Sequence, residues 1–514
     1  MRDLFVIGGG VNGVGIARDA AGRGLSVTLA EMGGLGGATS SASTKLFHGG
    51  LRYLEFFEFG LVKKALVERG VLMEMMPHIS WPMRFVLPYS PDMRFEGDTP
   101  TSKLLTTVMP WMKGRRPSWL IRMGLAMYDR MGGKGHFPGT KTIDLTTDPA
   151  GKPLKSRFTK AFEYSDAWVE DSRLVVLNAR DAEAWGAEIL TRTKVTGARR
   201  EGDHWVIETS RGEHRARAIV NAGGPWVSDI ITGVLKRNTG EGIRLVRGSH
   251  LVTKQLFDHG KCYFFQGEDG RIIFAIPYET DFTLIGTTDA EHPDPNETPR
   301  ITPEETRYLL DFASEYFERP VTEGDIVHTY SGVRPLYDDG AKSATAATRD
   351  YVLTFEKHEG APLLNVFGGK ITTYRTLSQK ATDMVAERLG NSKGHWTAGA
   401  HLPGGDFAVG GAPVLAAHLA KAHPFLTERW ALRLVRAYGT EAEQVLNGAK
   451  EASELGRDFG ATLTEAEVRW LMEREYARTA EDVVWRRSKL GLRMSEAEVA
   501  ALDDWMTGKL EAAE

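Results

Sequence analysis

The stretch DLFVIGGGVNGVGIARDAAGRGLSVTLAE, residues 3–31, decides the fold of the N-terminal part of this chain. The sequence predicts a buried strand over residues 3–7, a helix over residues 14–22 and a second apolar strand over residues 25–30 that ends on Glu31. A glycine-rich turn alone is weak evidence for any ligand. Here the G-x-G-x-x-G pattern lies between a strand and a helix, and an acid ends the next strand. This context predicts a βαβ unit that binds a dinucleotide.

Each glycine of this pattern has a separate physical task. Gly8 allows the tight turn, Gly10 lets the backbone approach a pyrophosphate, and Gly13 lets the helix lie close to the strand. The helix N-terminus adds free N–H groups and a positive dipole end for the phosphates. A carboxylate at Glu31 can accept hydrogen bonds from a ribose diol.

Composition limits the classes of protein to consider. The chain has 514 residues, enough for two or three domains with full hydrophobic cores. Its formal net charge of −4 argues against a general nucleic-acid binder. A single cysteine, Cys262, excludes an internal disulfide and a cysteine-cluster metal site, and fits a reducing compartment. No stretch gives the roughly 18 uncharged apolar residues of a spanning helix, so we expect no transmembrane segment.

The order of the later motifs favours a flavin over NAD. After Glu31 the chain enters a loop over residues 33–45 that is rich in glycine, serine and threonine and suits close contact with a ligand. An NAD dehydrogenase of the doubly wound type would continue with strand–helix alternation, whereas here glycine turns return only at residues 221–225 and 367–373. Such a discontinuous cofactor domain is what a tightly held flavin would need.

These features predict an α/β (α+β) protein with a Rossmann-like cofactor domain, a β-rich substrate or cap domain and an all-helical C-terminal domain. A hairpin is expected over residues 190–209 and a helix after the capping box at Thr302. A change in composition near residue 390 sets off the last domain. The expected division is a cofactor domain within residues 1–390 (about 1–90, 150–225 and 325–390), cap segments at about 91–149 and 226–324, and a helical domain at 391–514.

Residues 101–135 combine basic residues with Trp, Met and Leu, against one acid, Asp129. This mixture suits an interfacial segment on anionic lipid, and it equally suits a lid or a dimer contact. The basic residues of the segment are Lys103, Lys113, Arg115, Arg116, Arg122, Arg130 and Lys134.

Two stretches, HGGLRYL at residues 48–54 and FGGKITTYR at residues 367–375, are highly specific. Through them the chain resembles the FAD-dependent (aerobic type) glycerol-3-phosphate dehydrogenases of the D-amino-acid-oxidase-like flavoprotein superfamily. The resemblance covers essentially the whole chain, although the segment around 92–115 is longer than the family usually carries. Its other matching stretches are 6–23, 38–55, 330–336, 348–351 and 484–487.

The resemblance implies oxidation of sn-glycerol 3-phosphate to dihydroxyacetone phosphate, with hydride passing to N5 of a non-covalent FAD and electrons passing on to a membrane quinone. It also implies a cytoplasmic protein held peripherally on the inner face of the cytoplasmic membrane, and a possible homodimer. A phosphate monoester needs cations with bidentate reach. The resemblance places Arg334, Arg349 and Lys370 at the phosphate and the substrate oxygens, and Lys370 would alternatively lie near flavin N1.

Oxidation of an alcohol also needs a group that accepts the hydroxyl proton. Arginine is unsuited because its pKa lies far above working pH. His48 and His250 are therefore the candidate bases, and Arg52 and Tyr53 are expected beside His48.

For FAD, the fingerprint glycines and Glu31 are expected to hold the ADP half of the molecule. Four residues of the serine-rich loop, 39–41 and 45, are expected at the ribityl and pyrophosphate region. Val195 is expected at the adenine, and the glycine turn at residues 369–372 is expected at the flavin. Those further expected contacts are Thr39, Ser40, Ser41, Lys45, Val195, Gly369, Lys370, Ile371 and Thr372.

Three other activities remain open at this point. A glycerol-3-phosphate oxidase that uses O2 has the same fold and substrate, and spacing does not distinguish oxygen from quinone. A 2-hydroxyacid or amine dehydrogenase of the same superfamily would leave the phosphate-suited cations without a task. A non-catalytic flavin-binding or NAD-sensing protein would do so as well.

Overall fold

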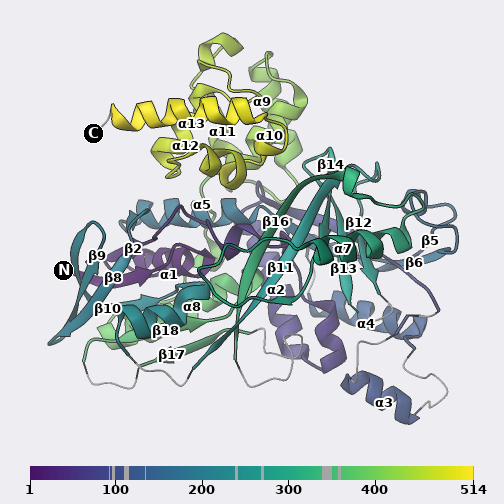
Figure 1. Ribbon diagram of the computed structural model, residues 1–514, viewed down its shortest axis with the longest axis horizontal. Coiled ribbons are helices and arrows are strands. Elements are labelled where there is room, and N and C mark those ends of the chain that lie inside the picture. Colours follow the sequence, from purple (N-terminus) through teal and green to yellow (C-terminus); the bar gives the residue numbers. More distant parts are fainter. Residues whose placement is uncertain are drawn as a thin grey trace.

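Two large sheets and a group of C-terminal helices make up the computed structural model (Figure 1). The structure describes residues 1–91, 93–94, 99–108, 115–132, 135–237, 241–267, 271–338, 350–356 and 360–512, without the side chains of residues 52, 104–106 and 108. Among the described helices none is long and apolar enough to pass through a bilayer.

The first sheet contains the predicted βαβ unit: β1 (Arg2–Ile7), α1 (Val11–Gly22) and β2 (Val27–Ala30). The strand order is β17-β18-β10-β1-β2-β7, with β8 and β9 added antiparallel beside β10. β1 is parallel to both β2 and β10, which is the arrangement that a crossover helix requires. The other strands are β7 (Glu188–Leu190), β8 (Val195–Glu201), β9 (His204–Thr209), β10 (Gly212–Asn221), β17 (Val352–Phe355) and β18 (Leu363–Phe367).

Both faces of this sheet are apolar, and each is covered by a different part of the chain. Helices cover one of the two faces. Leu4 and Val6 of β1 face a core formed with α1, α5 (Asp171–Ala184) and α8 (Tyr374–Leu389). Phe5 and Ile7 face the other side, where the predicted hairpin β8–β9 and residues 230–235 pack.

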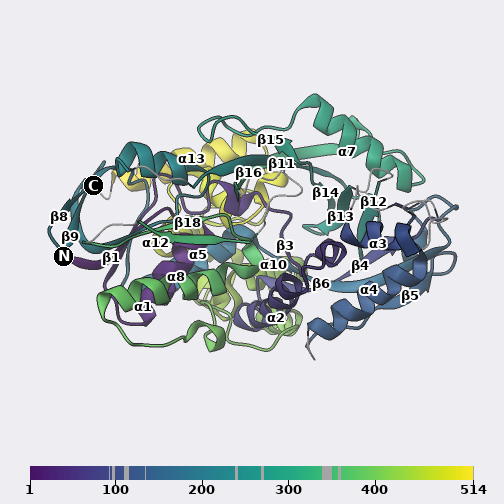
Figure 2. The ribbon, with the colours of Figure 1, turned by 90° about the horizontal axis from the view of Figure 1, so that it is seen from below.

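Within the described residues, the second sheet has ten strands in the order β15-β11-β14-β13-β12-β4-β6-β3, with β16 beside β11 and β5 beside β6. One face carries α7 (Pro303–Tyr316), which begins at the predicted capping box, and the other carries α2 (Phe59–Met75) and α4 (Ser118–Met131) (Figure 2). A further short helix, α3 (Pro100–Val108), precedes α4. The strands are β3 (Leu46–Phe47), β4 (Ser80–Pro88), β5 (Lys141–Asp144), β6 (Lys160–Val169), β11 (Ile243–Lys254), β12 (Cys262–Gln266), β13 (Ile272–Tyr278), β14 (Phe282–Gly286), β15 (Ala290–Glu291) and β16 (Ile326–Tyr337).

The second sheet corrects the expected division of residues 1–390. Strands β3, β4, β6 and β16 lie in segments that we assigned to the cofactor domain, yet they belong to the second sheet. The apolar side chains of β4 and β6 alternate between two buried faces, so the sequences of these two strands resemble strands of the first sheet. Residues that neighbour each other in sequence therefore pass repeatedly between the two sheets.

The C-terminal region is helical, as predicted, and has a core of its own. Its helices stand together above the two sheets in Figure 1. They are α9 (Ala412–Ala422), α10 (Glu428–Tyr438), α11 (Ala442–Leu446), α12 (Glu465–Arg474), the π-helical turn η12 (Asp482–Arg487) and α13 (Glu496–Glu511).

Candidate active site

The fingerprint turn is shaped by close backbone contacts. Gly8 has φ +108°, and a Cβ there would lie 2.5 Å from the carbonyl oxygen of Ala222. A Cβ at Gly13 would lie 1.9 Å from the Gly8 carbonyl oxygen, so only glycine lets α1 approach β1 this closely. Ser40 accepts a hydrogen bond from the Val11 N–H at 3.0 Å, which brings the serine-rich loop to the helix N-terminus.

Glu31 follows β2 and faces the same turn. Its carboxylate accepts hydrogen bonds from the N–H groups of Gly9 at 2.6 Å and Gly33 at 2.7 Å. Burial raises the pKa of Glu31, and these two N–H groups oppose the rise. The carboxylate is thus fixed in orientation at the place where the ribose is predicted.

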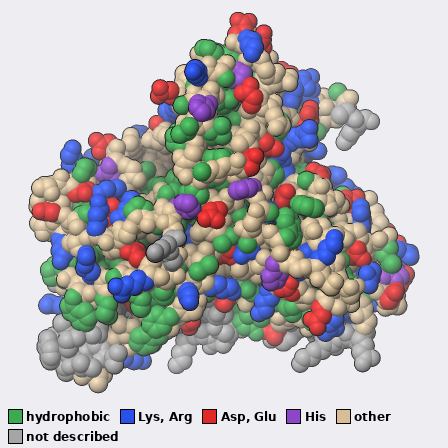
Figure 3. All heavy atoms as spheres, turned by 180° about the vertical axis from the view of Figure 1, so that it is seen from behind, with side chains coloured by type: hydrophobic (Ala, Val, Ile, Leu, Met, Phe, Trp, Pro, Cys, Tyr) green, Lys and Arg blue, Asp and Glu red, His purple; other side chains and the backbone are tan. Residues whose placement is uncertain are grey.

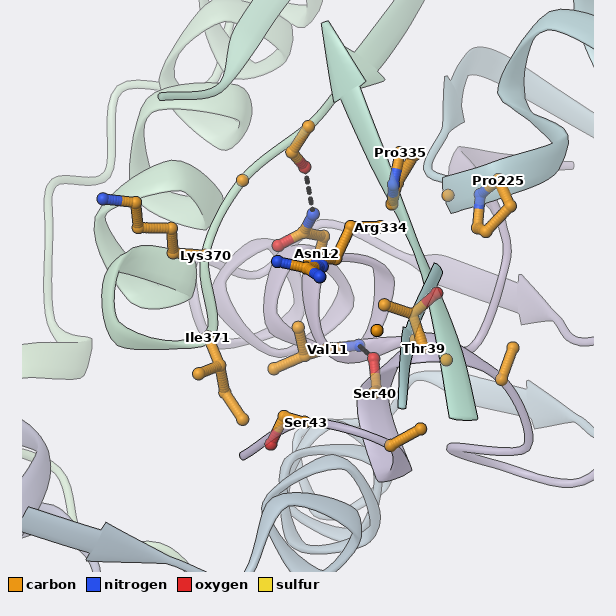
Figure 4. A pocket seen from close by; sticks show the side chains of 18 of the residues that line it. Val11, Asn12, Thr39, Ser40, Ser43, Pro225, Arg334, Pro335, Lys370 and Ile371 are labelled. Atoms are coloured by element: carbon orange, nitrogen blue, oxygen red, sulfur yellow. Dashed lines mark hydrogen bonds between the residues drawn. The ribbon is translucent and has the colours of Figure 1, made fainter. Parts of the chain in front are cut away.

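One cavity of about 1440 Å³ lies between the two sheets. Its wall combines the fingerprint turn, the serine-rich loop, β11, β16 and the glycine turn after β18. Figure 4 shows labelled residues of all of these except β11. It exceeds the roughly 300–1,000 Å³ of ordinary small-molecule pockets and suits a dinucleotide together with a substrate. The predicted site residues in its wall are Gly8, Gly10, Glu31, Thr39, Ser40, His48, Tyr53, Val195, His250, Arg334, Gly369, Lys370, Ile371 and Thr372.

Three predicted contacts lie outside this wall. Gly13 supports the turn from behind, and the Ser41 hydroxyl bonds to the carbonyl of Ala38 at 3.2 Å. Lys45, which we predicted at the ribityl and pyrophosphate region, is instead buried at 1% exposure, and its Nζ contacts Asp171 at 2.7 Å. We correct that prediction: Lys45 has φ +60°, and its side chain pairs with the first residue of α5.

Two predicted substrate contacts fall outside what the structure describes. Arg349 lies outside the described residues, and the same is true of the side chain of Arg52. Both therefore remain predictions.

Arg334 brings a cation to the cavity from β16. Its Nη2 donates to the Thr288 carbonyl at 2.8 Å and pairs with Asp289 Oδ1 at 2.6 Å. Gly248 on the neighbouring β11 leaves room for it, since a Cβ there would lie 2.6 Å from Arg334 Nη2. These contacts fix the guanidinium against the cavity wall.

Lys370 follows Gly369, whose φ is +102°. The Lys370 Nζ lies 3.9 Å from the centroid of the Tyr53 ring, a cation–π contact between two predicted residues. In Figure 4 the Lys370 side chain extends away from Arg334. The structure thus brings Lys370 to Tyr53 rather than to Arg334.

The two candidate bases differ in their surroundings. His250 is 2% exposed, lies against the Tyr330 ring with centroids 4.7 Å apart, and has Nε2 2.9 Å from Thr44 Oγ1. Burial, with the charges of Lys45 and Arg334, lowers the pKa of His250 to about 3, so the imidazole is neutral at ordinary pH. Its Nδ1 has no partner within the described part of the chain.

His48 is placed by its backbone. Its N–H donates to Thr372 Oγ1 at 3.3 Å, so the predicted substrate turn and the predicted flavin turn contact each other directly. His48 lines the same cavity as His250.

Sequence reasoning missed Asn12, which occupies a variable position of the fingerprint. Its Nδ2 donates to the Gly368 carbonyl at 3.2 Å and so joins the first glycine turn to the last (Figure 4). Its Oδ1 is buried without a partner among the described residues. Arg271 and Arg486 also line the cavity, and Arg486 comes from the C-terminal helical region. Spacing in the sequence carries no signal for contacts between elements so far apart.

These features fit a dinucleotide cofactor. The glycines of both turns present bare backbone to the cavity, and the orphaned Oδ1 of Asn12 calls for a hydrogen-bond donor. The N-terminus of α1 supplies positive potential for two phosphates. Cys262 is buried on β12 and is not among the residues that line the cavity.

Comparison with known protein families agrees with this fit. A family model described as "FAD dependent oxidoreductase" matches residues 3–375, and one described as "C-terminal domain of alpha-glycerophosphate oxidase" matches residues 395–508. The chain belongs to the FAD-dependent oxidoreductase family. It is an oxidoreductase whose cofactor is FAD.

Several relatives match nearly the whole chain. D-erythritol 1-phosphate dehydrogenase from Brucella abortus is 46% identical over 98% of this chain and 97% of its own length. Aerobic glycerol-3-phosphate dehydrogenase from Escherichia coli is 43% identical over 98% and 97%. The solved glycerol-3-phosphate dehydrogenase from Bacillus halodurans, complexed with FAD, has a TM-score of 0.70 and 26% identity over 99% of this chain and 91% of that one. The predicted fold class and cofactor are confirmed.

Proposed function

We propose that the protein oxidises sn-glycerol 3-phosphate to dihydroxyacetone phosphate and passes the electrons to a membrane quinone. The observation that carries this proposal is the placement of Arg334 in the cavity wall shared with the predicted flavin turn. A guanidinium that is held by the Thr288 carbonyl and Asp289 is preorganised to bind a phosphate monoester. The relatives from Escherichia coli and Pseudomonas aeruginosa, 43% and 44% identical, are named for this substrate.

Bound FAD supplies the acceptor for the hydride that leaves substrate C2. The protein has to bind the phosphate, orient C2 and remove the hydroxyl proton. Arg334 serves the first task, and Lys370 beside Tyr53 serves the second. His48, in the cavity wall, is the first candidate for the proton acceptor; His250 is the second, because burial lowers its pKa to about 3 and so makes it a weak base.

A second substrate, a four-carbon polyol phosphate, is favoured by a specific observation. The relative named D-erythritol 1-phosphate dehydrogenase has 46% identity, against 43% for the Escherichia coli glycerol-3-phosphate dehydrogenase. The two substrates share the phosphate and an alcohol next to further hydroxyl groups. They therefore use the same cation and base.

Anaerobic flavin absorbance tests both candidates. We expect sn-glycerol 3-phosphate to bleach the flavin band and glycerol to leave it unchanged. Arg334→Met should raise the substrate concentration needed by about 10- to 100-fold, the loss of a charged hydrogen bond. The control Arg319→Met removes an exposed arginine that pairs with Asp325, and should change nothing.

Other outcomes identify other substrates or acceptors. Bleaching by D-erythritol 1-phosphate at much lower concentration would replace the proposed substrate, and bleaching by lactate or glycine alone would overturn it. Reoxidation by air as fast as by a ubiquinone analogue would indicate an oxidase. Light scattering on the purified protein tests the homodimer, and a monomer would contradict it.

We further propose that α4 rests on anionic lipid at the inner face of the cytoplasmic membrane, where a quinone is within reach. Ile121, Leu125 and Tyr128 are the buried face of α4, whereas Trp119 is 52% and Met123 54% exposed. The basic residues Arg122 and Arg130 are exposed on the same helix. On the face of the molecule drawn in Figure 3, basic and acidic side chains are interspersed and form no large basic surface. The proposal therefore rests on the exposed residues of α4.

The structure also reduces the number of basic residues in segment 101–135 that can contact lipid. Arg116 is buried, pairs with Glu55 and donates to Gln266 Oε1 at 2.5 Å, so it is not available to lipid. Lys113 lies outside the described residues.

Liposome flotation tests this surface. We expect the protein to float with anionic vesicles, and the double variant Trp119→Ser, Met123→Ser to remain in solution, because lost apolar area weakens insertion. Val414→Ser is the control, since Val414 is 60% exposed on α9. Equal flotation of all three proteins would contradict the proposal and leave α4 as a lid or a contact between subunits.

A further inference from the structure

A buried group of polar side chains lies behind the turn that carries His48. The turn follows β3 and comprises His48, Gly49 and Gly50, of which His48 and Gly50 line the cavity. The N–H of Gly49 donates to the hydroxyl oxygen of Tyr128 at 2.7 Å. Tyr128 is 1% exposed and projects from the buried face of α4.

The Tyr128 hydroxyl is itself oriented by a buried carboxylate. It donates to Asp166, whose two oxygens lie 2.8 and 3.0 Å away. Arg69 of α2 pairs with Asp166 Oδ1 at 2.5 Å and also donates to the Ser165 carbonyl at 2.7 Å. Three elements, α2, α4 and β6, thus hold one hydroxyl in place.

Close packing leaves the turn no other position. A Cβ at Gly49 would lie 2.6 Å from Leu66 Cδ2 and 2.8 Å from Tyr128 Cε2. Gly50 has φ +76°, a conformation that an L-residue rarely adopts. The backbone of the turn therefore packs directly against Tyr128. The hydrogen bond from the Gly49 N–H to the Tyr128 hydroxyl fixes the position of the turn relative to the cavity.

We propose that Tyr128 is a positioning residue: its hydroxyl, oriented by Asp166 and Arg69, holds the Gly49 amide and thereby sets the place of His48 and Gly50 at the substrate end of the cavity. This inference rests on the proposed function. Tyr128 does not line the cavity and acts through the turn.

The energetic argument rests on burial. Without the hydroxyl, the Gly49 N–H loses its acceptor at 2.7 Å and has only the Asp166 carboxylate to turn to, while Asp166 loses the donor that Tyr128 supplies. Asp166 is 3% exposed, and burial raises its pKa to about 6 despite the opposing charge of Arg69, so its carboxylate depends on these donors. Relaxation of the turn by about 1 Å is enough to cost about 100-fold in rate at a preorganised site.

Tyr128→Phe is the test, and Tyr164→Phe is its matched control. Tyr164 is 2% exposed and meets the Tyr128 ring edge-on with centroids 6.0 Å apart, but its hydroxyl does not bond to the turn. We expect Tyr128→Phe to retain FAD, to lose tenfold or more in kcat with a smaller change in KM, and to exchange the amide hydrogens of residues 46–50 faster. Tyr164→Phe should stay within about twofold of the wild type in all three measurements.

A second variant covers poor folding of the first. Asp166→Asn leaves Tyr128 an acceptor oxygen of the same shape, so kcat should fall between the wild type and Tyr128→Phe. If Tyr128→Phe, or Asp166→Asn in its place, matches Tyr164→Phe in kcat and in amide exchange, the proposal is overturned. Amide exchange needs no substrate, so it separates this outcome from a failure of the proposed function, in which no polyol phosphate bleaches the wild-type flavin.

Discussion

The surroundings of His250 couple the stability of the protein to pH. The folded pKa is lowered to about 3, mainly by burial, while an exposed histidine titrates near 6.5. Below pH 6.5 the unfolded chain binds a proton that the folded chain excludes, so this contribution to stability is complete above pH 6.5 and is lost as the pH falls toward 3. The loss between pH 7.5 and 5 amounts to about 2 kcal/mol.

Urea titrations of the wild type and His250→Gln at several pH values measure this effect. As the pH falls from 7.5 to 5, the wild type should lose about 2 kcal/mol more unfolding free energy than His250→Gln, which has no imidazole to protonate. His418→Gln serves as control because His418 is exposed on α9 and meets similar solvent in both states. A difference that does not depend on pH would show that His250 titrates alike in the folded and unfolded chains.

Some residues of the site are positioned by their neighbours in the sequence, and others by residues far away in the sequence. Only the first kind can be placed from the sequence. Gly8, Gly10 and Glu31 could be placed from the sequence because a turn and the two strands beside it fix them. Lys45 could not, because its partner Asp171 lies 126 residues away. Asn12 was missed for the same reason: its meaning depends on Gly368, 356 residues later.

At the scale of elements, the sequence predicts whether a segment forms a strand or a helix more reliably than it predicts which sheet a strand joins. The first βαβ unit and the helix after Thr302 form as predicted, since turn chemistry and capping are local. Residues 80–88 and 160–169, which form β4 and β6 of the second sheet, lie in segments that we assigned to the cofactor domain; both faces of these strands are buried, which removes the alternation that would distinguish them. α4 shows the opposite case, in which one buried and one exposed face explain a segment that read only as basic and apolar.

The whole molecule is joined across its parts by buried ion pairs. Glu475, at the end of α12, is fully buried and pairs with Arg173 of α5, with a second contact of 3.0 Å. Arg173 also donates to the Ala437 carbonyl at 2.6 Å. Burial alone would raise the pKa of Glu475, but Arg173 lowers it, so the pair is charged. The C-terminal helices are thus attached to the helix that covers the FAD-binding sheet, and Arg486 of the same region reaches the cavity.

Glu475→Gln should therefore lower the stability of the protein and uncouple the C-terminal helices from the rest of the molecule. The substitution leaves Arg173 as a buried cation without its counter-charge, which costs about 3–5 kcal/mol. Its control is Glu465→Gln, whose pair with Arg469 is 2.6 Å long but solvent-exposed and should contribute about 1 kcal/mol or less. Calorimetry of the FAD-bound proteins should show a lower melting temperature for Glu475→Gln and a split of the transition, because the C-terminal helices lose their attachment to α5. Equal, small shifts for both variants would mean that apolar contacts, not this pair, hold the two parts together.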